Sequence, residues 1–351
     1  MSCRKLKDVV RQQKSSLKLS DLKKQGDFPV FGASGLVGYR DSFQSEKEAV
    51  AIIKDGAGIG RVSMLPKHSS VLGTMQMMEP TEEISNSYLF YYLSHLKLGK
   101  SFTGSTIPHI YFKNYSNSSF PDVSYDQQCQ IAEKLDAIRK SIEHKTDQLN
   151  ILDSLVKSRF MEMFKEWNLS FQKENWIKLS DLTNIYTGAT PKTEIEEYWN
   201  GLIPWVTPAE LDKDSYLITD TERHITEKGR KSKSLTMMPI GTVLLSTRAP
   251  IGKVAICGVP MTCNQGFKNF ECLGKLHPTY LFYLLKLNND WLQTQGTGTT
   301  FKEISKSKAG NIRIPVPTMS DQKDFAQFYN LVDKSRFVGE DCSCRSYEDL
   351  F

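Results

Sequence analysis

The chain has 351 residues, of which 39% are hydrophobic and 24% are charged. This composition is typical of a soluble globular protein, and the length predicts two domains. No stretch approaches the run of about 20 apolar residues that crosses a bilayer, and the basic N-terminus lacks the apolar centre of a signal peptide, so we expect a cytoplasmic protein. The seven cysteines are irregularly spaced, which favours reduced thiols over a zinc site.

The net charge of +5 is unevenly distributed. The segment 126–165 contains as many acidic as basic residues, and the segment 337–351 is acidic. The positive excess therefore lies in the rest of the chain, which makes a polyanion a reasonable partner, although basic soluble domains that bind no polyanion are common.

Residues 1–125 are predicted to form a mixed domain of helices and strands. The apolar run Ala49 to Ile53 is typical of a strand, and NSYLFYYLSHL at 86–96 is typical of a buried amphipathic helix. Between them, Asp55 to Gly60 looks like the glycine-rich turn of a dinucleotide or S-adenosylmethionine site. We interpret it as a hairpin instead, because the matching segment of the second half, Arg248 to Gly252, has Arg and Pro where a cofactor would need glycine.

Residues 126–168 are predicted to form one long helix that acts as a coiled-coil spacer. From Asp126 onward, apolar residues recur at alternating steps of four and three, and the series is broken only by Lys145 and Arg159. About 38 helical residues would span roughly 57 Å at 1.5 Å per residue. The residues predicted to pack this helix are Ile131, Leu135, Ile138, Ile142, Leu149, Leu152, Val156 and Met163.

Residues 169–318 are predicted to form a second domain that repeats the first. KLSDL occurs at 18–22 and at 178–182, IGRV at 59–62 corresponds to IGKV at 251–254, and YLFY at 88–91 recurs at 280–283. The offset grows from 160 to 192, which predicts about 32 extra residues in the second copy, including TGATPKT and the aromatic stretch 198–205. A shortened second helix is predicted at 319–337, followed by an atypical acidic tail at 338–351.

In this order, the pieces resemble the specificity subunits of type I restriction-modification systems. The resembling segments are FPVFGASGLVGY, DGAGIGRVSML and GSTIPHIYFKNY in the first copy, and YWNGLIPWVTPAEL, LLSTRAPIGKVAI and GTTFKEISKSKAGNIRIPVP in the second. The resemblance covers about residues 5–336. It implies an α+β fold in which two related target-recognition domains are separated by long coiled-coil helices. The short second helix departs from the family pattern and leads us to expect a truncated or recombined end.

The resemblance also implies a function and partners. Each domain would read one half of a split double-stranded DNA target, and the helices would set the unread spacer and dock the modification subunits. S-adenosylmethionine, ATP and Mg²⁺ are expected on the modification and restriction subunits, and no cofactor, metal or catalytic residue is expected in this chain. The alternatives are a self-contained DNA methyltransferase or nuclease with an unrecognised motif, or a coiled-coil scaffold that binds only protein.

Candidate DNA-contacting residues are those types that bind phosphates or base edges and that fall in predicted loops. For any one of them the alternative is an ordinary surface or turn residue, and for Trp205 it is the core. The recurring Gly104-Ser105-Thr106 and Gly298-Thr299-Thr300 would let backbone amides approach a phosphate, although a structural turn explains the recurrence equally well. The candidates are Lys54, Arg61, Ser105, Thr106, His109, Tyr111 and Lys113 in the first copy, and Lys192, Trp205, Thr207, Arg248, Lys253, Gln265, Thr299, Thr300, Lys302 and Lys306 in the second.

Overall fold

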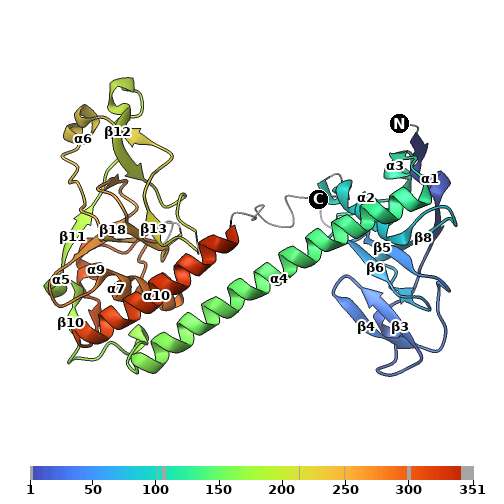
Figure 1. The fold of residues 1–351 in the computed structure, drawn as a ribbon, viewed down its shortest axis with the longest axis horizontal. Helices are drawn as coiled ribbons and strands as arrows, with labels where there is room; N and C mark the ends of the chain where they lie inside the picture. The colour runs from blue at the N-terminus through green and yellow to red at the C-terminus, as the bar shows by residue number, and fades with distance from the viewer. Residues whose placement is uncertain are drawn as a thin grey trace. The chain divides into compact units, whose positions relative to one another are not determined.

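The computed structural model describes residues 3–100, 102–104, 108–212, 214–248, 250–298 and 302–340. The chain divides into two compact units between Asp147 and Gln148. We call these the N-terminal unit and the C-terminal unit. Figure 1 shows that each unit contains both helices and strands, as the predicted α+β class requires.

The N-terminal unit is built on two small sheets. The larger sheet has the order β2-β8-β5-β6 with every neighbouring pair antiparallel, and the smaller has the order β4-β3-β7. Its elements are β1 (Cys3–Lys5), α1 (Leu6–Val9), β2 (Val10–Gln13), η1 (Leu19–Asp21), β3 (Phe28–Gly32), β4 (Gly35–Arg40), β5 (Ala49–Ile53), β6 (Val62–Leu65), β7 (Ser70–Val71), β8 (Met75–Pro80), α2 (Asn86–His95), η2 (Leu98–Lys100), α3 (Phe112–Tyr115), β9 (Ser119–Pro121) and the first part of α4 (Tyr125–Met163).

The C-terminal unit repeats this plan with one added strand. Its larger sheet has the order β11-β18-β15-β16-β13, in which β13 is the addition, and its smaller sheet has the order β14-β12-β17. Its elements are the rest of α4, η3 (Leu169–Phe171), β10 (Ile177–Lys178), α5 (Leu179–Leu182), β11 (Thr183–Thr187), η4 (Glu196–Tyr198), β12 (Trp199–Val206), β13 (Leu217–Ile218), β14 (His224–Ile225), α6 (Glu227–Ser232), β15 (Val243–Leu245), β16 (Val254–Cys257), β17 (Thr262–Cys263), β18 (Lys268–Cys272), α7 (Pro278–Leu287), α8 (Asn289–Thr294), α9 (Lys306–Asn311), β19 (Arg313–Ile314) and α10 (Met319–Glu340).

Strand register shows which residues of the two units are equivalent, and it corrects the start of the repeat. In the N-terminal unit Lys5 pairs with Ser119, and in the C-terminal unit Lys178 pairs with Arg313. The counterpart of KLSDL at 178–182 is therefore KLKDV at 5–9, whose Leu6 and Val9 are buried just as Leu179 and Leu182 are. The identical KLSDL at 18–22 is a coincidence, because it includes the short η1 turn, where Leu19 is exposed.

The same register moves the insertion of the C-terminal unit. Val30 and Trp205 occupy equivalent positions in β3 and β12, because each is the residue that pairs with the first residue of a short parallel strand, β7 or β17. The aromatic stretch 198–205 was predicted to belong to an insertion. It lies instead largely in β12, which has a counterpart, β3, in the N-terminal unit. The offset is 175 here and 193 at Val50 and Val243, so the added residues lie between β12 and β15 and include β13 and α6.

The larger sheet is buried on both faces, which explains why its central strand is continuously apolar. In β5, Val50 and Ile52 pack with α2 in one core, while Ala49, Ala51 and Ile53 pack in a second core on the opposite face. Because alternate residues of a strand point to opposite faces, all five side chains are buried. Strand β15 divides its residues between two cores in the same way.

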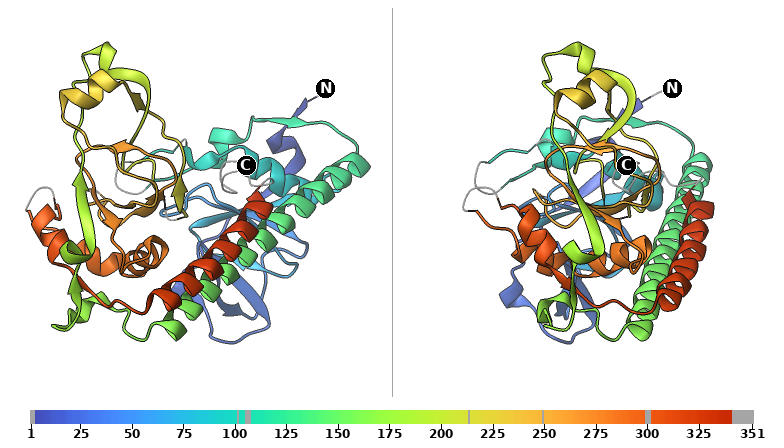
Figure 2. Two further views of the ribbon diagram at one scale, coloured as in Figure 1. Left: turned by 60° about the vertical axis from the view of Figure 1, so that its left-hand side comes forward. Right: turned by 90° about the vertical axis from the view of Figure 1, so that its left-hand side faces the viewer.

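A long helix follows the sheets of each unit. Within the C-terminal unit, Phe160 of α4 packs against Phe325 of α10 with ring centroids 4.9 Å apart, and Asp153 pairs with Arg336. The earlier residue of α4, Asp153, contacts the later residue of α10, Arg336, so the two helices run antiparallel. Figure 2 shows them side by side. Helix α10 extends to Glu340, three residues beyond the predicted end, and residues 341–351 of the predicted acidic tail lie outside the described residues. None of the helices in the described ranges is long and apolar enough to cross a membrane.

Candidate nucleic-acid interface

In the N-terminal unit, the tip of the β5–β6 hairpin, residues 54–61, is held against the paired residues Thr103 and His109, which we call the loop stem. We call this arrangement of tip and stem the clamp. Thr103 and His109 pair through two backbone hydrogen bonds, 2.9 and 2.7 Å long. A backbone bond from the amide of Ile110 to the carbonyl of Lys54 ties the stem to the tip. Across the same junction Asp55 Oδ1 lies 2.7 Å from His109 Nδ1.

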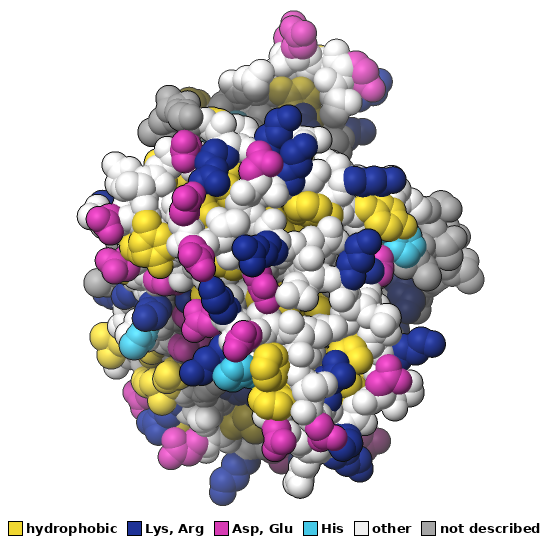
Figure 3. Space-filling view, turned by 90° about the vertical axis from the view of Figure 1, so that its right-hand side faces the viewer, with side chains coloured by type: hydrophobic (Ala, Val, Ile, Leu, Met, Phe, Trp, Pro, Cys, Tyr) yellow, Lys and Arg dark blue, Asp and Glu magenta, His cyan; other side chains and the backbone are white. Residues whose placement is uncertain are grey.

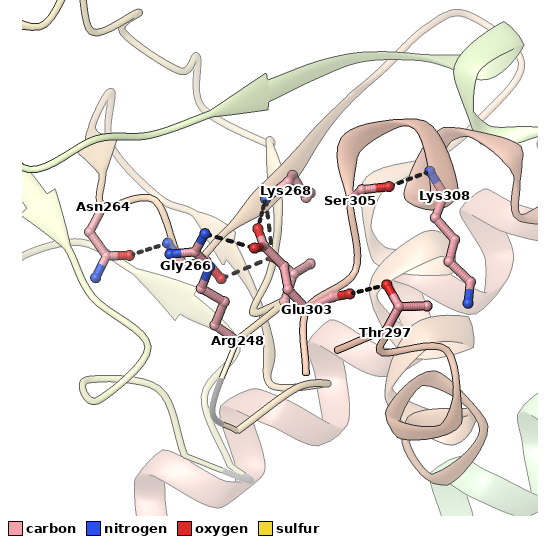
Figure 4. Close-up of polar contacts among 9 residues, drawn as sticks. Arg248, Asn264, Gly266, Lys268, Thr297, Glu303, Ser305 and Lys308 are labelled. Carbon is pink, nitrogen blue, oxygen red and sulfur yellow. Dashed lines mark hydrogen bonds and ion pairs between the residues drawn. The ribbon is translucent and has the colours of Figure 1, made fainter. Parts of the chain in front are cut away.

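The C-terminal unit has the same clamp with the acidic and the basic side chain exchanged between tip and stem. Thr297 and Glu303 form the stem through two 3.0 Å backbone hydrogen bonds, and the amide of Ile304 donates to the carbonyl of Thr247. Arg248, at the position of Asp55, pairs with Glu303, at the position of His109, at 2.7 Å (Figure 4). The same geometry therefore holds with an acid on the tip in one unit and a base on the tip in the other.

A positive-φ glycine ends each hairpin tip, as the shared IG[RK]V segments predict. Gly60 has φ of +81° and Gly252 has φ of +100°, a conformation that glycine adopts without strain. A Cβ at Gly60 would lie 2.1 Å from the amide nitrogen of Gly99, and one at Gly252 would lie 1.9 Å from Asn289 Oδ1. Interpreting the glycine-rich segment as a hairpin is therefore confirmed.

The candidate residues of the N-terminal unit gather at this clamp. Lys54 lies at the tip, 3.7 Å from the carboxylate of Asp55, and exposed Arg61 lies where the tip returns to β6. His109 stacks on Tyr111, and the ammonium group of Lys113 lies 5.6 Å from the Tyr111 ring centroid. Ser105 and Thr106 lie outside the described residues.

The candidate residues of the C-terminal unit are more spread. Arg248 lies at the tip, and exposed Lys302 and Lys306 flank Glu303 on the stem side. Exposed Gln265 accepts a 2.7 Å hydrogen bond from Thr190, and Lys192 is exposed in the loop before β12. Thr299 and Thr300 lie outside the described residues.

Three other candidates have structural partners inside the C-terminal unit. Lys253 donates to the carbonyl of Pro208 at 2.9 Å, and Thr207 caps a turn by donating to Glu210. Trp205 is only 2% exposed, packs edge-to-face on Trp199 and donates its indole N–H to the carbonyl of Ala189. Its predicted role as a DNA contact is corrected to a core residue, because its ring has no free face.

Sequence reasoning missed Asp55, Lys268 and Glu303. Lys268 Nζ lies 3.1 Å from Glu303 Oε1, and the hydrogen bond from Arg248, with the Lys268 bond as a further cause, holds the pKa of the Glu303 carboxyl below its usual range. The signal was available in the repeat: at offsets of 193 and 194, Asp55 aligns with Arg248 and His109 aligns with Glu303, so the acidic and the basic residue exchange places.

The predicted helix seam divides into two parts. Leu152, Val156 and Met163 pack into the core of the C-terminal unit, together with Phe160 and Phe164. Towards the start of α4, by contrast, the buried contacts come from Gln128 and Ala132, and Asp136 accepts a 2.6 Å hydrogen bond from Tyr91. The remaining seam residues, Ile131, Leu135, Ile138, Ile142 and Leu149, are exposed or partly exposed.

On the face drawn in Figure 3, Lys and Arg side chains are interspersed with Asp and Glu, so that face has no continuous basic patch. Among the described residues, no group of three or more His, Cys, Asp or Glu side chains could hold a metal ion. The clamped tips are the sites at which the two units share one backbone geometry but present different side chains.

Comparison with known proteins agrees with this duplicated architecture. Residues 1–152 and 173–336 each match the family model of the type I restriction modification DNA specificity domain. The chain therefore belongs to the type I restriction-modification DNA specificity family. The crystal structure of an S subunit from M. genitalium covers 95% of this chain and 90% of its own with a TM-score of 0.62 and 17% identity, which supports the fold.

Two curated relatives carry the word specificity in their names. The MjaIX specificity subunit of Methanocaldococcus jannaschii is 39% identical over 184 residues, which cover 51% of this chain and 43% of that protein. The EcoR124I/EcoR124II specificity subunit of Escherichia coli is 26% identical over 261 residues, which cover 70% of this chain and 63% of that protein. The matched segments thus span less than two thirds of either relative.

Proposed function

We propose that this chain recognises a bipartite DNA sequence for a type I restriction-modification complex and leaves the bond-making steps to other subunits. The observation that carries the proposal is the duplication: apart from the added β13, both units have the same strand order and the same clamped tip, yet different side chains at the tip. A shared scaffold with divergent loops suits two readers of different half-sites.

In this proposal α4 and α10 have two tasks. As a continuous 39-residue helix, α4 links the two units, and its length sets the number of unread base pairs between the half-sites. The apolar residues left exposed on α4 dock modification subunits, which supply S-adenosylmethionine, while a restriction subunit supplies ATP-driven chemistry with Mg²⁺. The names of the two relatives, which call them specificity subunits of type I restriction enzymes, support a place for this chain in such a complex.

The test compares the purified chain with the chain plus its modification subunit. We expect the chain alone to bind duplex DNA with an affinity that falls steeply as salt rises, because phosphate contacts release counterions. We expect labelled S-adenosylmethionine to methylate DNA only when the modification subunit is added. Methyl transfer or cleavage by the chain alone would contradict the proposal, and so would an absence of salt-dependent binding.

A further inference from the structure

Two cations from different elements share the carboxylate of Glu303. Arg248, at the hairpin tip, approaches Oε2 at 2.7 Å, and Lys268, in β18, approaches Oε1 at 3.1 Å (Figure 4). The backbone of Glu303 is independently fixed by its two hydrogen bonds to Thr297. Glu303 therefore keeps its position even when one of its cations leaves.

The two cations differ sharply in burial. The Lys268 side chain is 8% exposed and also lies 3.4 Å from Thr247 Oγ1, so its ammonium group has little access to anything outside the unit. The Arg248 side chain is 48% exposed. Lys268 thus compensates the charge of Glu303 permanently, whereas Arg248 can turn outward at low cost because Glu303 is not left unpaired.

The N-terminal unit lacks this arrangement. There the hairpin tip carries the acid, Asp55, and the position of Lys268 is occupied by Gln76, which accepts a 3.3 Å hydrogen bond from Tyr115. A releasable guanidinium at the tip is therefore a property of the C-terminal unit. Arg also suits DNA better than other cations, because its planar fork matches a phosphate or the edge of guanine.

We infer that Arg248 exchanges Glu303 for an acceptor oxygen of DNA, and that Lys268 keeps Glu303 in place during the exchange. The inference rests on the proposed function and names one contact within it. In the free protein Glu303 holds Arg248 against the stem, so DNA must compete with Glu303 for the guanidinium group. Glu303 and Lys268 are positioning residues, and Arg248 is the contact.

The experiment measures binding of the full chain to a mixed-sequence duplex over a series of salt concentrations. We expect Arg248→Ala to weaken binding roughly tenfold. For a phosphate contact the slope of log K against log salt falls by about 0.9, and Arg248→Lys restores most of the affinity. For a guanine contact the salt slope stays unchanged, and Arg248→Lys instead relaxes the preference at one base pair of the methylated motif.

The variant Glu303→Gln distinguishes an ion pair that Arg248 leaves on binding DNA from one that only holds the loop stem in place. If Glu303 restrains Arg248, the variant binds DNA at least as tightly as the original chain, opposite in sign to Arg248→Ala. If the pair merely holds the loop stem, both variants weaken binding to the same extent, and the inference is overturned. Arg159→Ala and Glu162→Gln are the controls, because Arg159 is about as exposed as Arg248 and also pairs with a glutamate, but this pair lies on α4; we expect neither variant to change the salt slope.

A second variant keeps the inference testable should Glu303→Gln fold poorly. Lys268→Met leaves Glu303 dependent on Arg248, so we expect weaker DNA binding when Arg248 is present and no further loss in an Arg248→Ala background. An equal loss in both backgrounds overturns the inference. If the original chain binds DNA and Arg248→Ala binds equally well, the inference alone fails, whereas the proposed function fails if the original chain does not bind at all.

Discussion

At the scale of single residues, the structure separates side chains that maintain the fold from side chains that are free to bind. Trp205 and Tyr111 were both candidate DNA contacts, yet Trp205 is buried in an aromatic cluster while Tyr111 is exposed beside His109 and Lys113. Residue type alone could not distinguish them, because Trp and Tyr occur both in cores and at interfaces.

This difference predicts opposite outcomes for two alanine variants. Trp205→Ala should lower the free energy of unfolding by about 3–5 kcal/mol, since it leaves a cavity in the core. Tyr111→Ala should change it by less than about 1 kcal/mol and should weaken DNA binding instead. Urea unfolding and DNA titration of both variants check this. Equal stability of the two variants would show that Trp205 is not a core residue.

The clamp around Glu303 predicts a pH dependence of stability. The pKa of Glu303 is lowered in the folded state, chiefly by Arg248 and then by Lys268, so the carboxylate stabilises the fold at neutral pH and this contribution is lost as the pH falls through the lowered value. Glu303→Gln should therefore cost about 1 kcal/mol at neutral pH and almost nothing in acid. Urea unfolding at several pH values measures this difference.

Glu194→Gln, at an exposed position in the same unit, serves as the control for that measurement. The free energy of unfolding of Glu194→Gln should equal that of the original chain at every pH. A deficit of Glu303→Gln that persisted unchanged into acid would mean that the carboxylate charge is not what stabilises the clamp.

At the scale of elements, the heptad pattern of α4 predicted a helix correctly but only part of its packing. The periodicity correctly identified Val156 as buried. At Arg159, where the apolar pattern is interrupted, the neighbouring Phe160 is the buried residue, and it packs with Phe164, Tyr280 and Phe325. A strict repeat of seven assumes a partner helix along the whole length. Here the last turns of α4 pack against both α10 and α7, as part of a globular core.

The exposed part of the seam predicts where partner subunits bind. Ile138 is 49% exposed and Ile151 is 66% exposed, yet only Ile138 lies on the seam. Changing either to Asp should leave the unfolding free energy of the chain nearly unchanged, because neither side chain is buried. Ile138→Asp should also abolish or weaken association with the modification subunit, whereas Ile151→Asp should not. Co-purification and gel filtration measure this, and equal behaviour of the two variants would reject the seam as a docking surface.

The repeat shows most clearly how far sequence reasoning reached. Segments whose role depends on local backbone geometry, such as IG[RK]V and YLFY, were aligned correctly, because glycine turns and buried helices constrain residue type. KLSDL at 18–22 was misaligned, since an exposed turn and a buried helix can share five letters. Only strand register distinguished it from the true counterpart, KLKDV at 5–9.

At the scale of the whole molecule, the proposed function and the shared topology of the two units predict that each unit reads its half-site independently. We expect that exchanging residues 177–318 for the corresponding segment of a relative changes one half of the methylated motif and leaves the other half intact. Each unit has its own cores and its own clamp, so the exchange should not disturb the N-terminal unit. Sequencing methylated host DNA provides the measurement, and altered bases in both halves would contradict independence.

The strand pairs that open and close each unit have a consequence for how such genes change. β1 pairs with β9 and β10 pairs with β19, so the two ends of each recognition fold meet as hydrogen-bonded neighbours about 5 Å apart. A cassette of coding sequence with breakpoints in those two strands can be replaced without altering the path of the chain on either side. If each unit reads one half-site as proposed, an exchange at those two points would replace one reader and leave the other unchanged.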